Sequence, residues 1–148
     1  MKILIADDHS IVRRGLQQII GMRQGWAVAG EVSTPDEVLP ELRRQAVSVL
    51  ILDVSIGDRS KIALLANIRA EFPSLPVLML SMHAEEQYAI RCLRAGASGY
   101  IQKDSSPEEL IEAIECVAMG RRYVSQAVAE QRATEVSRGS SSSPDEGH

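Results

Sequence analysis

Short apolar segments alternate with longer amphipathic segments along most of the chain. The apolar segments are rich in Val, Ile and Leu, which is typical of strands buried in a sheet. They occupy residues 2–6, 27–32, 47–53, 76–80 and 98–102. Apolar positions at helical spacing follow each of them, over residues 10–20, 34–45, 60–71, 84–95 and 106–118. Five strands that alternate with five helices predict an α/β fold, a doubly wound five-stranded parallel sheet with helices on both faces.

Capping residues stand at several of the expected helix starts. Ser10 is expected to cap the first helix and Ser106 the last, because a hydroxyl oxygen can accept a hydrogen bond from a free N–H of the first turn. Thr34, Pro35 and Glu37 have the spacing of a capping box with Pro at the first helical position. These signals support the boundaries that the apolar periodicity indicates.

The composition changes near residue 123. A chain of 148 residues can build one ordinary globular domain and has little room for a second. Residues 123–148 contain few apolar positions and end in a segment of Ser, Gly, Pro and acidic residues. We therefore predict a single domain over residues 1–122 and a linker or tail over residues 123–148, part of which has the pattern of a helix.

Composition also argues against several classes of protein. The formal net charge of −4 disfavours binding to nucleic acid through phosphate neutralisation alone. Cys92 and Cys116 lie in helical segments away from any metal-binding spacing, so we expect neither a disulfide framework nor a structural zinc site. No apolar run has the length of a signal-peptide core or a membrane span, which predicts a cytoplasmic protein without a membrane partner. The arginine pairs at residues 13–14 and 121–122 are interpreted as solvated charges that a partner could use.

Polar residues follow four of the predicted strands at the point where each strand ends. They are Asp7 and Asp8 after the first strand, Asp53 at the third, Ser81 at the fourth and Lys103 at the fifth. In an open α/β sheet the carboxyl ends of the strands meet at one edge, where the functional crevice lies. We expect these five side chains to converge at that edge.

Three carboxylates at one edge repel one another and need protons or a cation nearby. Mg²⁺ is the natural candidate, because it takes oxygen ligands and is commonly held by one or two carboxylates together with phosphate oxygens. Beside the Mg²⁺, Lys103 adds a further positive charge and Ser81 a hydroxyl, a set that points to a visiting anion. A carboxylate nucleophile, Mg²⁺ and a lysine are the components of phosphoryl transfer to an aspartate.

Four segments resemble the receiver domain of bacterial two-component response regulators. They read ADDHSIVRRGL, LILDVS, VLMLSMHAEEQYAIRCLRAGASGYIQKDSSPEELIEAI and GRRYVS. Together they are similar to the NarL/FixJ subfamily, whose output domain is a LuxR-type helix-turn-helix. The resemblance covers about residues 1–125 and implies the flavodoxin/CheY-like receiver fold.

The resemblance implies a phosphorylation-controlled signalling domain of a transcription factor. In that family's terms, Asp53 would accept a phosphoryl group from a sensor histidine kinase. Mg²⁺ would be held by Asp8, Asp53 and the backbone carbonyl of Ser55, with Asp7 acting through water. Lys103 would pair with the acceptor and then with the phosphoryl oxygens.

Three further residues take roles from the same resemblance. Ser81 would hydrogen-bond the phosphoryl group, Tyr100 would be the aromatic residue at the edge that moves with it, and His83 would tune hydrolysis. The chain departs from the family in residues 56–61, where Ile-Gly replaces Met-Pro and a Lys replaces the usual Gly. Losing the proline loosens this loop, so magnesium affinity and the rate or lifetime of phosphorylation could differ from those of the family.

These features favour a regulatory domain with self-catalysed phosphorylation and dephosphorylation over an enzyme. The implied partners are a sensor histidine kinase, a second copy of the chain when phosphorylated, and DNA only through an output domain that we expect beyond His148. A phosphorylation-independent protein-interaction module stays open as an alternative. An aspartate-nucleophile phosphatase would need an Asp where Ser55 stands, and a dinucleotide-binding fold would need glycines where ADDHS stands.

Overall fold

The computed structural model describes residues 1–53, 61–81 and 86–124 of the chain. Its strands are β1 (Lys2–Ala6), β2 (Ala27–Val32), β3 (Val49–Asp53), β4 (Val77–Ser81), β5 (Gly99–Gln102) and β6 (Tyr123–Val124). Its helices are α1 (Ser10–Gly21), the short 3-10 turn η1 (Pro35–Glu37), α2 (Val38–Arg44), α3 (Lys61–Glu71), α4 (Glu86–Arg94) and α5 (Pro107–Ala118). Each predicted strand and helix is present, with small shifts at the ends.

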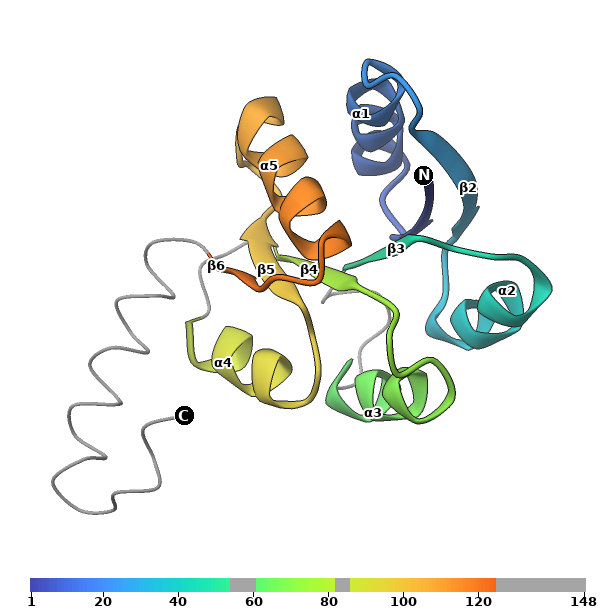
Figure 1. Ribbon diagram of the computed structural model, residues 1–148, viewed down its shortest axis with the longest axis vertical. Helices are drawn as coiled ribbons and strands as arrows, with labels where there is room; N and C mark the ends of the chain where they lie inside the picture. Colours follow the sequence, from blue (N-terminus) through green and yellow to red (C-terminus); the bar gives the residue numbers. More distant parts are fainter. Residues whose placement is uncertain (54–60, 82–85, 125–148) are drawn as a thin grey trace, which may run out of the picture.

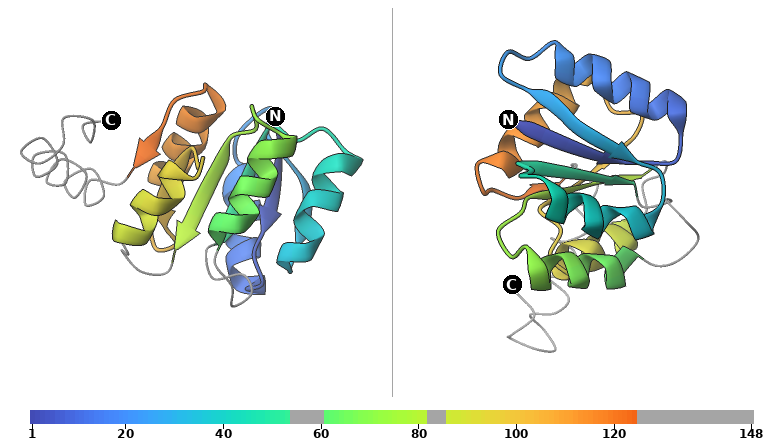
Figure 2. Two further views of the ribbon diagram at one scale, coloured as in Figure 1. Left: turned by 90° about the horizontal axis from the view of Figure 1, so that it is seen from below. Right: turned by 90° about the vertical axis from the view of Figure 1, so that its right-hand side faces the viewer.

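All strand pairs are parallel, and the order across the sheet is β2-β1-β3-β4-β5-β6. Helices α1 and α5 cover one face, and α2, α3 and α4 cover the other (Figure 1). Seen from below, the latter three lie side by side across the sheet (Figure 2). The doubly wound parallel fold is therefore confirmed.

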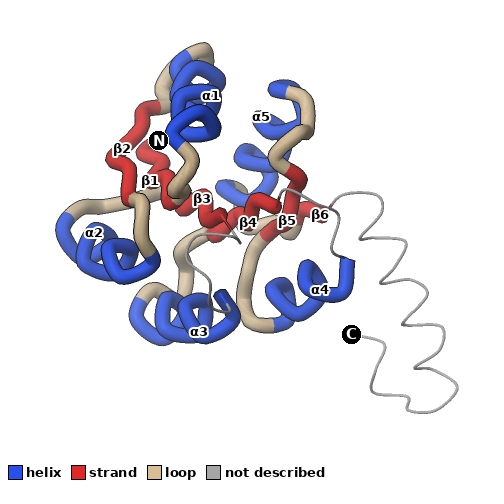
Figure 3. Tube along the Cα trace, turned by 180° about the vertical axis from the view of Figure 1, so that it is seen from behind, coloured by secondary structure: helices blue, strands red, loops and turns tan. Residues whose placement is uncertain are grey.

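The core consists of two apolar layers, one on each face of the sheet. Figure 3 shows the helices that cover these two faces. Neighbouring residues of β3 alternate between them, so Leu50 packs toward α2–α4 while Ile51 packs toward α1 and α5. Every residue of β3 and β4 is buried. Burial on both faces explains why these strands appear in the sequence as continuous apolar runs rather than as alternating ones.

The sheet has a sixth strand, where the sequence predicted five. Tyr123 and Val124 pair with Gly99 and Tyr100 of β5, and the N–H of Tyr123 also donates to the carbonyl of Ser98 at 3.0 Å. A Cβ atom on Gly99 would lie 2.8 Å from the Tyr123 carbonyl oxygen, so the missing side chain permits this close pairing. Two residues are too few to show a periodicity, which is why the pattern of the sequence did not reveal β6.

Two of the three predicted helix starts are as expected. Ser106 accepts a hydrogen bond from the N–H of Glu109 at 3.1 Å, and Thr34 and Glu37 form the capping box. The prediction for Ser10 was wrong, because His9 occupies the cap position and Ser10 is the first helical residue. The loop after β1 holds the His9 side chain among the acidic residues that follow that strand, and this shifts the helix start by one residue.

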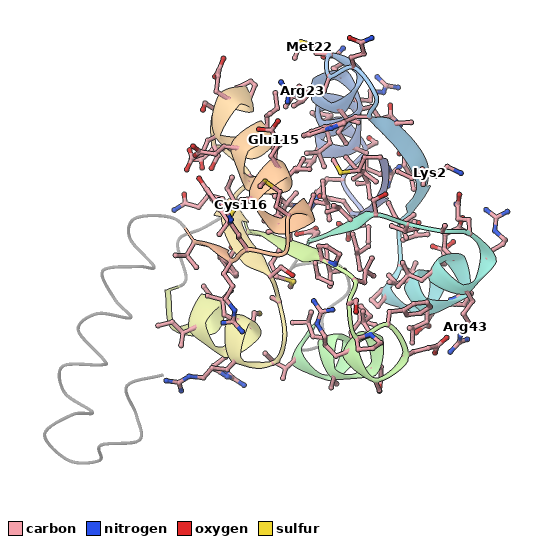
Figure 4. The ribbon with its side chains drawn as sticks, viewed as in Figure 1. Lys2, Met22, Arg23, Arg43, Glu115 and Cys116 are labelled. Carbon is pink, nitrogen blue, oxygen red and sulfur yellow. The ribbon has the colours of Figure 1, made fainter. Side chains whose placement is uncertain are left out.

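Helices α1 and α5 are joined at their carboxyl ends. Arg23, just beyond α1, pairs with Glu115 of α5, and the two side chains point toward one another in Figure 4. The guanidinium of Arg23 also lies over the ring of Trp26, 5.2 Å from its centroid. Within the described ranges, every helix falls short of the length and apolarity that crossing a bilayer requires.

Candidate functional site

The carboxyl ends of β1, β3 and β5 bring three charged residues together. Ala6 stands opposite Leu52 in the parallel register, so Asp7 and Asp53 are neighbours at the next position. Ser81 stands opposite Gln102, which puts Lys103 one residue past the end of β5. Residues far apart in the sequence thus meet because their strands end at the same edge of the sheet.

Lys103 bridges the two buried carboxylates. Its Nζ atom lies 3.0 Å from Oδ2 of Asp53 and 3.2 Å from Oδ2 of Asp7. The side chain of Lys103 is 4% exposed and those of Asp7 and Asp53 are 1% and 0% exposed, so water screens these ion pairs weakly. This pairing offsets much of the cost of burying two like charges at the end of the sheet.

The surroundings of Asp7 shift the pKa of its carboxyl upward. Burial raises the pKa of the Asp7 carboxyl, and the charge of Asp53 raises it further. The backbone N–H of His9, which donates to Oδ1 of Asp7 at 2.7 Å, and the ammonium of Lys103 act in the opposite direction. Burial is the largest of these influences, so the pKa of Asp7 lies above its ordinary value.

Arg13 supports the same loop from helix α1. Its guanidinium donates to the backbone carbonyl of Asp7 at 2.6 Å and pairs with Glu31 at 2.9 Å. The interpretation of Arg13 as a solvated charge was therefore wrong. The error arose because Glu31, on β2, is distant in sequence and becomes a neighbour only when β2 pairs with β1.

His9 is the residue of this cluster that the sequence analysis missed. Its Nδ1 atom lies 3.1 Å from a carboxylate oxygen of Asp7, 3.1 Å from one of Asp8 and 3.6 Å from Oδ2 of Asp53. The same atom is 3.1 Å from Nζ of Lys103. The available signal was its position, directly after the Asp pair at the carboxyl end of the first strand.

The remaining predicted residues fall into two groups. Ser81 is buried at the end of β4, and its carbonyl accepts a hydrogen bond from the N–H of Lys103 at 2.7 Å. Tyr100 is 1% exposed and lies within β5, packed in the apolar layer under α2–α4 rather than at the open edge. Ser55, His83 and most of the altered loop at residues 56–61 lie outside the described residues.

The model of the family "Response regulator receiver domain" matches residues 3–115. The chain belongs to the response regulator receiver family. It is 31% identical over 133 residues to the response regulator UvrY of Escherichia coli K12, covering 90% of this chain and 61% of UvrY. It thus spans about three fifths of that relative's length.

Solved structures of response regulators are also similar to the chain, both in fold and in sequence. A LuxR-family response regulator from Aurantimonas has a TM-score of 0.84 and 34% identity, over 90% of this chain and 96% of that one. The isolated receiver domain of Salmonella enterica RcsB, determined with the phosphomimetic BeF3⁻, has a TM-score of 0.79 and 28% identity, over 88% and 96% of the two chains. These relatives confirm the resemblance to the NarL/FixJ subfamily and the regulatory, phosphorylation-based class of function.

The donor atoms of the cluster suit a hard divalent cation. Asp7, Asp8, His9 and Asp53 each contribute one possible ligand atom, and these atoms lie within 4.8 Å of one another. Three of the four are carboxylates, the ligands that Mg²⁺ prefers, and the exposed carboxylate of Asp8 leaves room for the waters that Mg²⁺ retains. The residues present therefore fit Mg²⁺, which receiver domains generally bind at an acidic pocket.

Proposed function

We propose that this chain is the phosphorylation-controlled receiver of a LuxR-type transcription factor, and that Asp53 is its phosphoacceptor. The observation that carries the proposal is the position of Lys103, whose ammonium contacts Asp53 and Asp7 at 3.0 and 3.2 Å. This arrangement puts a buried carboxylate beside the positive charge that an incoming phosphoryl group requires. Membership of the receiver family supports a phosphohistidine of a sensor kinase as the phosphoryl donor.

In the proposed reaction, an Oδ atom of Asp53 attacks phosphorus in line with the P–N bond of the phosphohistidine. The new P–O bond forms as the P–N bond breaks, and the leaving imidazole takes a proton from solvent. Lys103 then pairs with the oxygens of the transferred group. Its three N–H donors can follow that charge without losing contact with Asp7.

Mg²⁺ would be held by Asp8, Asp53 and the backbone carbonyl of Ser55, with Asp7 acting through water. When bound, the ion supplies positive charge that offsets the mutual repulsion of the phosphoryl oxygens. Asp7 suits this more indirect part, because its buried carboxylate already contacts the ammonium of Lys103 at 3.2 Å. His9, half-exposed beside Asp8, is placed to move aside or to contribute to the ligand set.

The readout would pass through the strands next to the acceptor. A phosphoryl group adds about −1.5 to −2 charges, toward which the hydroxyl of Ser81 at the end of β4 would move. Tyr100 would respond in β5, where it pairs with Val124 of β6. Because β6 leads out of the domain toward the residues beyond 124, a shift of β5 would reach the connection to an output domain.

Partners and domain limits follow from the same proposal. The chain would work with a sensor histidine kinase, form a homodimer when phosphorylated, and contact DNA only through an output domain outside this sequence. The share of UvrY that the chain spans, 61%, leaves room for such a domain. We assign residues 1–122 to the receiver and residues 123–148 to the connection, whose first two residues, β6, attach it to the edge of the receiver's sheet.

The test is phosphorylation with acetyl phosphate and Mg²⁺, followed by intact-mass measurement. We expect one added phosphoryl group on the natural chain, none on Asp53→Asn, and an unchanged result for Asp36→Asn, a carboxylate in η1 away from the cluster. Addition of a phosphoryl group to Asp53→Asn at the natural rate would refute the assignment of the acceptor.

A second measurement separates the proposal from a phosphorylation-independent interaction module. Beryllofluoride with Mg²⁺ should shift the amide resonances of residues 99–102 and 123–124, because these strands carry the proposed response. An unchanged spectrum would favour the interaction module. The lifetime of the phosphorylated form, compared before and after His83→Ala, would test the tuning role that the family resemblance implies for that residue.

A further inference from the structure

A basic hollow lies at the amino-terminal edge of the sheet, opposite the acidic cluster. Its volume is about 300 Å³. The lining comes from the end of α3, the start of β4, the turn between α4 and β5, and the turn between α5 and β6. The charged residues in this lining are Arg69, Arg121 and Arg122, and no described acidic residue contributes to it.

The side chain of Arg69 is held in one place by backbone groups. Its Nε donates to the carbonyl of Gly96 at 2.7 Å, and its guanidinium also donates to the carbonyl of Leu75 and to Oγ of Ser98. Gly96 has a φ of +118°, and a Cβ atom there would lie 2.6 Å from Cγ of Arg69. Glycine is therefore required both for the turn and for the space that Arg69 occupies, which makes this guanidinium a preformed part of the hollow.

The positive charge of the hollow lacks a carboxylate partner in the described part of the chain. By contrast, Arg23 and Arg43 each pair with a glutamate. Burial lowers the pKa of Arg69, and the charge of Arg122 lowers it further, so the two guanidinium groups are close enough to repel one another. An anion between them would relieve this repulsion and replace the missing counter-charge.

The donors in the hollow match the oxygens of phosphate groups. Arg121 and Arg122 can each present paired N–H donors to a phosphate group, whereas Arg69, whose N–H groups largely bind backbone carbonyls, contributes mainly its positive charge. Three cations around one hollow favour a ligand with more than one negative charge. Ser98 adds a hydroxyl whose oxygen already accepts from the N–H of Val77 at 3.1 Å and from Arg69, so its own proton can be donated to a ligand. We propose that the hollow binds a small molecule that carries phosphate groups, independently of phosphorylation at Asp53.

The size of the hollow sets the size of the ligand. Small-molecule sites begin at about 300 Å³, which is more than a single phosphate ion fills. A diphosphate group, or a phosphorylated metabolite of similar size, is the ligand class that fits. A long polymer such as duplex DNA would place most of its phosphates outside the hollow.

Such a ligand would join the turn before β6 to the rest of the domain. At present that turn is held through Cys116 of α5, whose carbonyl accepts from the N–H of Arg121 at 3.2 Å and whose Sγ contacts the carbonyl of Arg122 at 3.3 Å. Figure 4 labels Cys116 on α5, near this turn. A bound diphosphate would add contacts from the Arg121–Arg122 side to Arg69 of α3, and so stabilise the attachment of β6.

The test is titration of the whole chain with pyrophosphate, followed by calorimetry and amide chemical shifts in Mg²⁺-free, low-salt buffer. We expect saturable binding and shifts at Gly96, Ser98 and Gly120, which line the hollow. The double variant Arg121→Ala/Arg122→Ala should weaken binding by about tenfold or more, because two charge-assisted contacts are lost. Retention of the response to beryllofluoride would show that this variant remains folded.

The matched control is Arg43→Ala/Arg44→Ala, which removes the same charge from two arginines of α2 that already pair with Glu71 and Glu41 and that do not line the hollow. It should change pyrophosphate affinity by less than about twofold. Equal losses in both double variants, or no saturable binding to the natural chain, would overturn the proposal. So would binding of a short DNA duplex in preference to pyrophosphate at equal phosphate concentration, which would assign these arginines to nucleic acid.

Discussion

Replacing Lys103 by Met removes the positive charge between two buried carboxylates and leaves a side chain of similar length. At an effective dielectric constant of about 20, separations of 3.0 and 3.2 Å correspond to roughly 5 kcal/mol of attraction each, before the cost of burying the ammonium is subtracted. Breaking a buried pair in this way costs about 3–5 kcal/mol, since it leaves uncompensated charge behind. We expect Lys103→Met to lower the free energy of unfolding by about that amount in Mg²⁺-free buffer at neutral pH.

Urea denaturation followed by the fluorescence of Trp26, the single tryptophan, provides the measurement. Adding Asp7→Asn to Lys103→Met should restore much of the loss, because one of the two unpaired negative charges is then removed. Arg43→Met, which breaks an exposed pair with Glu71, should change stability far less. A loss below about 1 kcal/mol for Lys103→Met, or no recovery in the double variant, would refute the electrostatic account of the cluster.

Three other predictions concern the cluster, the sixth strand and the last helix. The pKa of Asp7 is raised in the folded state, so protonation of this carboxyl stabilises the fold at pH values below its ordinary pKa of 3.8. This contribution to the free energy of unfolding is lost as pH rises through the pKa of the folded state. As pH rises above that value, the urea midpoint of the Asp7→Asn variant should therefore increase relative to that of the natural chain. A difference between the two midpoints that stays constant with pH would contradict the raised pKa of Asp7. Gly99→Ala should lower the free energy of unfolding by about 1–3 kcal/mol and speed amide exchange at Val124, because the added Cβ atom would lie 2.8 Å from the Tyr123 carbonyl oxygen. An unchanged exchange rate at Val124 would show that β6 tolerates the contact. Ser106→Ala should cost about 1 kcal/mol in thermal or urea unfolding, while Ser106→Asp, which keeps a capping oxygen, should cost less.

Local pattern was sufficient for most of the fold. The doubly wound arrangement follows from alternating strand and helix signals, and the capping residues Thr34 and Ser106 were identified from their spacing alone. Both depend on residues a few positions apart, so tertiary structure is not needed to recognise them. The start of α1 was misassigned by one residue because His9, which lies beside Asp7 and Asp8 and also near Asp53 and Lys103, takes the cap position.

The types of residue at the strand ends determined which chemistry the site could carry. Because parallel strands present their carboxyl ends at one edge, Asp7, Asp53 and Lys103 could be placed together from the sequence. Their distances, the burial that raises the pKa of Asp7, and the inward position of Tyr100 depend on packing between elements.

The alternation of apolar and polar residues thus determined the sheet, its helices and the edge at which the acidic residues lie. Only the tertiary structure decided that His9 joins that cluster, that Tyr123–Val124 forms a sixth strand, and that three arginines surround one hollow. The physical reason is range. Periodicity and capping act over a few residues, whereas these three features depend on contacts between segments that only the packed sheet brings within a few ångströms of one another.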